Sequence, residues 1–131
     1  MKFILLVYTD NEQLNALPAG EFDVMMRDCL SHADELRRNG TLIDTQMLQE
    51  APAAKSVRIR NAHISVTDGP FSETKEILGG FNLIEAADMD EAVRIAAEFP
   101  WTSVGCVEIR PVLEVEDMRQ RVNASNVEGA A

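Results

Sequence analysis

The stretch KFILLVYTD, residues 2–10, decides the fold because it is apolar on both sides of an extended chain. Successive side chains of a β-strand point to opposite faces of its sheet. Positions 3, 5 and 7 carry Phe, Leu and Val on one face, and positions 4, 6 and 8 carry Ile, Leu and Tyr on the other. We therefore predict a strand within a sheet that is covered on both faces.

The rest of the chain alternates between strand and helix patterns. Helical spacing covers residues 21–39 and 88–99, and Asp88 with Glu91 three residues later is typical of a helix start. Strand-like alternation covers residues 41–49, 77–86 and 104–115, with a hairpin at residues 57–67. This order predicts an α+β fold, a split βαβ sheet with an inserted hairpin. Residues 116–131 are predicted to form a flexible tail.

The first strand also predicts an oligomer. Two helices in a split βαβ layout cover only one face of the sheet, and the strand needs cover on both. A second copy of the same sheet is the simplest cover for the other face. We therefore expect a homodimer with two sheets packed face to face.

Composition and charge exclude several classes of protein. The chain has 131 residues, is 46% hydrophobic and has a net charge of −10, which fits one globular domain and disfavours nucleic acid and anionic membranes as partners. It has no apolar run near the roughly 20 residues of a membrane span, so a cytoplasmic protein is expected. Cys29 and Cys106 lie in apolar segments and are predicted to be reduced core thiols.

The segment TDGPFSETKEILGGF, residues 67–81, combines several turn-forming pairs with charged side chains. Asp68-Gly69-Pro70 predicts a tight turn that holds the Asp68 carboxylate at the rim of the sheet. Asp68 would then be a candidate for acid/base chemistry. The structural alternative is that its carboxylate accepts hydrogen bonds from the backbone of its own turn.

His32, at the edge of the buried face of the first helix, is the candidate partner of Asp68. A carboxylate beside a half-buried imidazole can raise its basicity and fix its tautomer, which makes an acid/base pair. Arg110 on the last strand is a candidate anchor for an anionic substrate group. The alternatives are that His32 is only a packed side chain and that Arg110 forms an ion pair with Glu108 or Glu114.

No metal and no cofactor is predicted. The chain has two histidines, far apart in sequence, and no His/Asp/Glu cluster at the spacing of metal ligands. Gly79-Gly80 lacks the spacing of a phosphate-binding loop. We expect these glycines to mark a bulge or a close approach of another group.

The segment VTDGPFSETKEILGGFNLIEAADMDEA, residues 66–92, with MKFILLVYTD at the start and GCVEIRPVLEV near the end, resembles the YCII-related family, in particular its branch named for the Asp-Gly-Pro-Phe motif. The resemblance covers about residues 1–115 and implies one ferredoxin-like domain that forms a dimeric α/β barrel. In the wider family a helix His and an Asp before a Gly-Pro turn are regarded as a catalytic pair, which His32 and Asp68 would match. One member looks like a lyase that removes chloride from a chlorinated hydroxyquinol.

Three functions remain open from the sequence. The first is a small-molecule lyase or isomerase that uses His32 and Asp68 for acid/base chemistry and Arg110 for substrate binding. The second is a non-catalytic ligand-binding or regulatory domain with a protein partner, since the resemblance implies genes near those of alternative sigma factors. The third is a structural dimer without a ligand. Convergence of His32 and Asp68 at a pocket would favour catalysis, and a pocket without it would favour binding.

Overall fold

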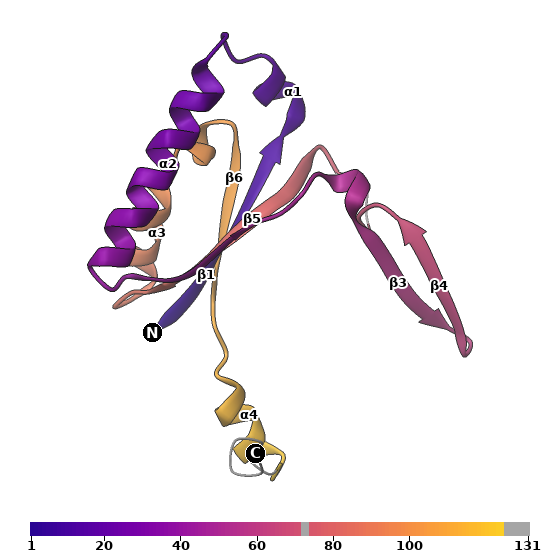
Figure 1. Cartoon of the computed structure of the whole chain (residues 1–131). Helices are drawn as coiled ribbons and strands as arrows, with labels where there is room; N and C mark the ends of the chain where they lie inside the picture. Colours follow the sequence, from indigo (N-terminus) through magenta and orange to yellow (C-terminus); the bar gives the residue numbers. More distant parts are fainter. Residues whose placement is uncertain (72–73, 125–131) are drawn as a thin grey trace.

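The computed structural model describes residues 1–71 and 74–124, which form an α+β fold with one main sheet (Figure 1). The elements in chain order are β1 (Lys2–Asp10), α1 (Asn11–Asn15), α2 (Glu21–Arg38), β2 (Leu42–Met47), the 3-10 helix η1 (Ala51–Ala53), β3 (Lys55–Arg60), β4 (His63–Asp68), β5 (Glu76–Glu85), α3 (Met89–Ala97), the 3-10 helix η2 (Pro100–Ser103), β6 (Gly105–Pro111) and α4 (Val115–Arg121). Among these residues no helix is long and apolar enough to cross a membrane.

The main sheet is four-stranded and antiparallel, in the order β2-β5-β1-β6. β1 is a central strand, paired with β5 on one side and β6 on the other. Because the chain passes from β1 through α2 to β2 while β5 lies between β1 and β2, this is the predicted split βαβ arrangement. The predicted α+β class and the order of the main elements are therefore confirmed.

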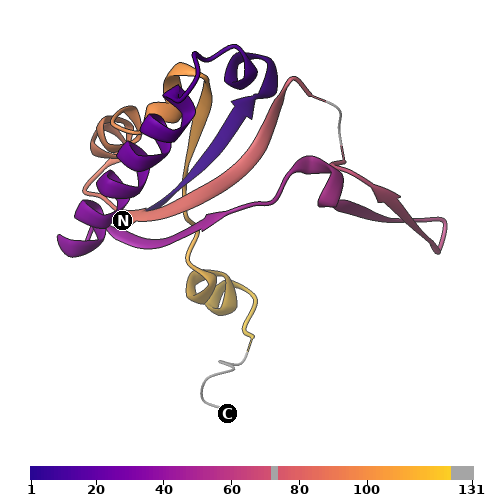
Figure 2. The ribbon, with the colours of Figure 1, turned by 45° about the horizontal axis from the view of Figure 1, so that its top comes forward.

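Helices α2 and α3 cover one face of the sheet (Figures 1 and 2). The core between the helices and the sheet is built around Phe3, Leu5, Ile84 and Phe99, whose side chains are fully buried. The predicted N-cap of α3 is confirmed, because Asp88 accepts a hydrogen bond of 2.9 Å from the backbone N–H of Glu91. That bond satisfies one of the free N–H groups at the helix start.

The other face of the sheet, which we call the open face, carries Ile4, Leu6 and Tyr8 of β1, all half-buried. None of the helices in the described part of the chain packs over it (Figure 1). Strand pairing places Glu108 opposite Leu6 and Arg110 opposite Ile4. The open face is thus an apolar strip bordered by charged side chains.

Strands β3 and β4 form a separate two-stranded sheet, the arm (Lys55–Asp68), which extends away from the body (Figures 1 and 2). The predicted hairpin is confirmed, and its turn contains Asn61 and Ala62 with φ of 52° and 65°. Positive φ at both central residues is typical of the tight turns that suit the twist of a hairpin. Neither strand of the arm enters the main sheet.

Glycines in β5 and β6 allow close strand packing. Gly80 pairs with Val7 and Leu78 pairs with Tyr8, so Gly79 is an extra residue and forms the predicted bulge. A Cβ on Gly80 would lie 2.6 Å from the backbone oxygen of Gln46. Both expectations for the glycine pair, a bulge and a close approach, are therefore confirmed.

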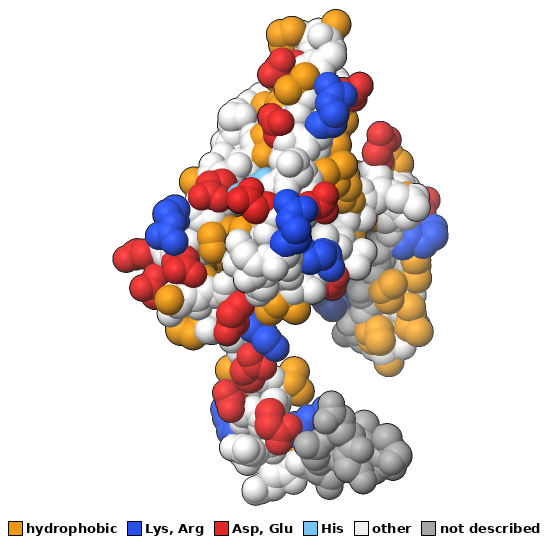
Figure 3. Space-filling view, turned by 60° about the vertical axis from the view of Figure 1, so that its left-hand side comes forward, with side chains coloured by type: hydrophobic (Ala, Val, Ile, Leu, Met, Phe, Trp, Pro, Cys, Tyr) orange, Lys and Arg blue, Asp and Glu red, His pale blue; other side chains and the backbone are white. Residues whose placement is uncertain are grey.

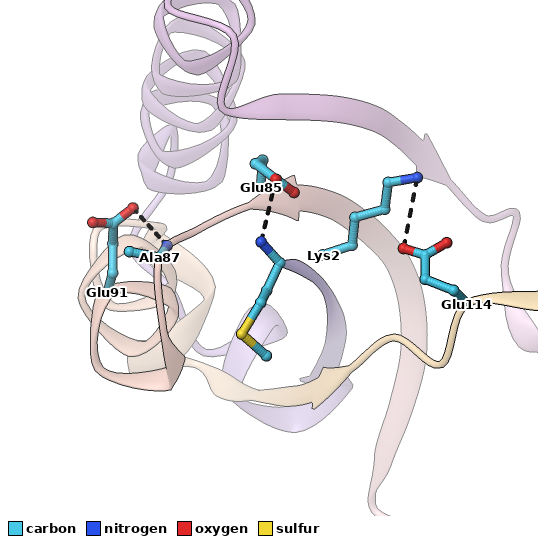
Figure 4. Close-up of polar contacts among 6 residues, drawn as sticks. Lys2, Glu85, Ala87, Glu91 and Glu114 are labelled. Carbon is cyan, nitrogen blue, oxygen red and sulfur yellow. Dashed lines mark hydrogen bonds and ion pairs between the residues drawn. The ribbon is translucent and has the colours of Figure 1, made fainter. Parts of the chain in front are cut away.

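Polar contacts join the strands and loops at one end of the sheet (Figure 4). The terminal amine of Met1 lies 3.2 Å from Glu85, and Lys2 lies 4.0 Å from Glu114. Charged side chains also cover the helix side of the molecule, where acidic groups are prominent (Figure 3). These exposed ion pairs each contribute little to stability.

The structure differs from the sequence-based predictions at three places. The short helices α1 and α4 were not predicted, and α4 lies where a flexible tail was expected from residue 116. Residues 125–131 of that predicted tail lie outside the described residues. Cys106 is exposed, so the prediction of two core thiols is wrong for this residue, because its strand position points to the open face, whereas Cys29 is half-buried.

Candidate ligand-binding cleft

A cleft of about 510 Å³ lies on the helix side of the sheet, beyond the end of the core. Its floor comes from β5 and the end of β1, one wall comes from α1 and the start of α2, and the other comes from the end of β2 and η1. Its lining includes Phe22, Met26, Cys29, Thr45, Asn82 and Trp101. A volume of this size is ordinary for small-molecule sites.

Asn82 is the buried polar group of the cleft, with only 6% of its surface exposed. It faces the helices because it pairs with Leu5 of the core-facing side of β1. Its Oδ1 accepts a hydrogen bond of 2.7 Å from the hydroxyl of Thr45 on β2. This bond fixes the orientation of the Asn82 amide, because its Oδ1 end is held by Thr45.

The Nδ2 end of the same amide has no hydrogen bond within residues 1–71 and 74–124. Within those residues the only buried side-chain nitrogen or oxygen without a partner is Nε2 of His32, so the Asn82 nitrogen is open to the cleft. Although the residue is largely buried, this N–H₂ group is accessible from the cleft and free to donate. A ligand acceptor or a water molecule in the cleft would supply a partner.

The lining around Asn82 is mainly apolar and aromatic. The rings of Phe22 and Trp101 lie with their centroids 6.0 Å apart and tilted by 42°. Glu50 is the one charged side chain among the lining residues that the structure describes. Such a site favours an uncharged, aromatic ligand over an anion, because it offers no cation and one carboxylate.

Cys29 lies in the wall of the cleft and accepts a hydrogen bond of 3.2 Å from the indole N–H of Trp101. Burial raises the pKa of the Cys29 thiol above its ordinary value, and the indole hydrogen bond only partly opposes this. A thiol with a raised pKa is protonated at neutral pH and is a weak nucleophile. Cys29 therefore contributes packing to the cleft.

Asp10, which the sequence analysis did not single out, positions the helix that forms one wall. Its side chain is nearly fully buried, and Oδ1 accepts a hydrogen bond of 2.9 Å from the backbone N–H of Glu12. This bond caps α1, which supplies Leu14 to the cleft. Lys75 lies 3.8 Å from the second oxygen of Asp10. The sequence signal that could have identified Asp10 is an Asp at the end of an apolar strand.

His32 lies about one helical turn beyond the cleft residue Cys29 and does not line the cleft; it lies in the groove between α2 and α3. Its ring packs against Phe99 edge to face, with centroids 4.7 Å apart. Its Nε2 lies 3.2 Å from a carboxylate oxygen of Glu98, although the geometry is not that of a hydrogen bond. These contacts agree with the alternative given above, that His32 is a packed side chain of the helix.

Asp68 lies at the base of the arm, at the opposite end from the Asn61-Ala62 turn, and its side chain is 83% exposed. Its carboxylate is 2.6 Å from Nζ of Lys55, across the hairpin. The next residue, Gly69, has φ of 89°, a conformation that favours glycine, and its backbone oxygen accepts a hydrogen bond from Ser56. The chain bends at Gly69 without forming the predicted tight turn, and Asp68 is the last residue of β4, paired with Lys55.

The structure does not bring the three predicted site residues together within one chain. His32 lies in the helix layer, whereas Asp68 lies on the arm, which extends away on the other side of the sheet (Figures 1 and 2). Arg110 lies on the open face, opposite Ile4, and does not line the cleft. Across the described residues, no three His, Cys, Asp or Glu side chains form a group that could hold a metal ion.

Comparison with known proteins shows similarity to one family and to individual proteins. A model of the YCII-related domain family matches residues 1–116. An uncharacterized protein of Rhizobium meliloti (strain 1021) is 34% identical over 114 residues, which cover 86% of this chain and 92% of that protein. A solved structure of 5-chloro-2-hydroxyhydroquinone dehydrochlorinase from Burkholderia phenoliruptrix, in complex with 2,5-dihydroxybenzoquinone, aligns over 89% of this chain and 98% of that chain, with 14% identity and a TM-score of 0.49.

Proposed function

The chain belongs to the YCII-related family, and from this premise we propose that it is a small-molecule-binding domain whose ligand occupies the cleft beside Asn82. The observation that carries the proposal is the amide of Asn82, which is held by Thr45 at one end and open to an apolar cleft at the other. The ligand is an uncharged, largely aromatic molecule. It places a hydrogen-bond acceptor, such as a carbonyl oxygen, against Nδ2.

The lining supports this class of ligand in two ways. Phe22 and Trp101 offer aromatic surface, which gains free energy when it is covered by a flat apolar molecule. Glu50 would repel a carboxylate or phosphate. Arg110, which was predicted to hold an anionic group, lies on the other face of the sheet.

We further propose that two copies pack their open faces together, as in the dimeric α/β barrel that the resemblance to the YCII-related family implies. The support is the half-buried apolar strip of Ile4, Leu6 and Tyr8, which needs cover on the side without helices. Burial and the neighbouring Glu108 carboxylate raise the pKa of Tyr8, so its neutral hydroxyl is compatible with an interface.

An acid/base lyase or isomerase reaction is the second candidate function. It requires His32 and Asp68 to act together, and within one chain they are separated. The observation that supports it is the exposure of Asp68, which is 83% exposed at the base of the arm and is therefore accessible to another chain. In this version the pair would form between two copies of the protein.

Coumarin tests the ligand-binding proposal, because it is neutral, aromatic and carries a carbonyl acceptor. The chain has a single Trp, so the indole N–H signal of Trp101 in an ¹⁵N-labelled sample reports directly on the cleft. We expect coumarin to shift this signal saturably. In the Asn82→Leu variant, which keeps a similar side-chain volume, we expect at least about 10-fold weaker binding, since a buried hydrogen bond is lost.

The matched control is Glu50→Gln, which changes a lining residue without removing the amide donor. Coumarin should bind this variant within about two-fold of the wild type, because a neutral ligand gains little from the loss of a charge. Far-UV circular dichroism verifies that both variants are folded. Equal coumarin affinity in the wild type and the Asn82→Leu variant, or no shift of the indole signal in the wild type, would overturn the proposal.

A further inference from the structure

The arm has one apolar face that its own chain leaves uncovered. Strand pairing places Val57 opposite Val66 and Ile59 opposite Ile64, so these four side chains share one face of the hairpin. Their exposed fractions are 64%, 56%, 60% and 71%, in that order. Isolated β-branched residues on a surface are ordinary, but four on one face form a continuous patch.

The arm also lacks the packing that usually stabilises a hairpin. An isolated two-stranded hairpin is marginally stable in water, and three strands or a packed layer are normally needed. β3 and β4 pair only with each other, and none of their residues is buried in the described chain. A surface outside this chain would supply the missing layer.

The charge of the arm differs in sign from the rest of the protein. The whole chain has 12 basic and 22 acidic side chains, of which residues 55–68 hold three basic and one acidic. The arm therefore has a net charge of +2, and the remainder has −12. A second copy of this chain offers an acidic body to this basic arm, and such complementarity favours and orients association.

The position of the arm also matches a second copy. The arm extends on the side of the sheet away from α2 and α3, beyond the edge of the open face (Figures 1 and 2). A second copy that packs on the open face would lie beside the arm. The apolar patch of the arm would then continue the apolar strip of Ile4, Leu6 and Tyr8.

From these observations we infer that the arm is a dimerisation arm, whose Val57, Ile59, Ile64 and Val66 face packs on the body of a second copy of this chain. The inference rests on the open-face dimer of the proposed function. The arm adds a second contact area to that dimer. The arms of the two copies are related by two-fold symmetry, so each copy both gives and receives one arm. The polar face of the arm, with Arg58 and Ser65, stays in contact with water.

Sedimentation analysis of the full chain tests the inference. The arm variant replaces the four apolar residues with threonine, which keeps the β-branch and the strand propensity while removing apolar surface: Val57→Thr, Ile59→Thr, Ile64→Thr and Val66→Thr. The matched control, His63→Thr with Ser65→Thr, changes the opposite face of the same hairpin. We expect a wild-type dimer, a dimer dissociation constant at least about 100-fold higher in the arm variant, and less than about a two-fold change in the control.

A third variant separates the arm from the open face. Leu6→Glu introduces a charge into the centre of the apolar strip and leaves the arm unchanged. If the arm variant dimerises like the wild type while Leu6→Glu is monomeric, the arm inference is overturned and the open-face dimer stands. If Leu6→Glu dimerises normally and the arm variant does not, the arm is confirmed and the open-face dimer fails. A monomeric wild type overturns both, and the coumarin titration remains an independent test of the cleft.

Discussion

Replacing Gly80 with alanine tests how tightly β2 and β5 pack at the floor of the cleft. The added Cβ would lie 2.6 Å from the backbone oxygen of Gln46, and real Cβ atoms essentially never approach closer than 3.0 Å. The neighbour is backbone of a paired strand, so β2 itself has to move. Overpacking of this kind costs about 1–3 kcal/mol, and we expect Gly80→Ala to lower the free energy of unfolding by this amount.

The adjacent glycine provides the control. A Cβ on Gly79 would lie 3.8 Å from its nearest neighbours, which is ordinary contact, and neither glycine has a positive φ. Gly79→Ala should therefore be neutral or stabilise by about 0.4–1 kcal/mol, through loss of freedom in the unfolded chain. Urea unfolding of both variants at one protein concentration measures the difference, because dimerisation makes stability depend on concentration. Equal stability of the two variants would refute the packing described here.

Two further predictions concern titratable groups. Because burial raises the pKa of Cys29 above its ordinary value of 9.0, the unfolded chain loses this proton first as the pH rises. The free energy of unfolding should therefore fall above about pH 9, and Cys29→Ala should reduce that fall in urea titrations; an identical fall in both proteins would contradict it. In NMR spectra, Glu98→Gln should move the ring signals of His32 because the two groups lie 3.2 Å apart, and Asp68→Asn should not. A His32 signal that moves on Asp68→Asn would support the acid/base pair between copies.

Local patterns in the sequence predicted most of the fold. β1 could be identified as a central strand because both of its faces are apolar, and α3 could be located because Asp88 is followed by Glu91 at the spacing of a cap. The hairpin was predictable from alternation around Asn61-Ala62. Each of these signals lies within a few residues of the feature that it predicts. Helix α4 was missed because its sequence has little apolar periodicity and none of its residues is buried.

The candidate site was harder to predict, because its residues come from distant segments of the chain. Asn82 and Thr45 meet only through the pairing of β2 with β5, and Trp101 reaches Cys29 only through the packing of η2 near α2. The lone asparagine in the apolar run of β5 was a usable signal. The alternation of polar and apolar residues in β6 correctly placed Arg110 on the same face as Glu108. It could not show that the cleft lies on the opposite face of the sheet.

The way the arm joins the sheet has a consequence for the divergence of related proteins. The chain leaves the sheet after Met47 and returns at Glu76, and near this junction Leu48 donates a 2.9 Å hydrogen bond to the backbone oxygen of Gly79. Exit and re-entry are thus adjacent, and doubling the length of such an insert costs only about 0.6 kcal/mol in closure entropy. Natural selection can lengthen, shorten or exchange this insert while the four-stranded sheet keeps its pairing. Relatives can therefore keep the same sheet and cleft while the segment inserted at this one junction differs in length and surface.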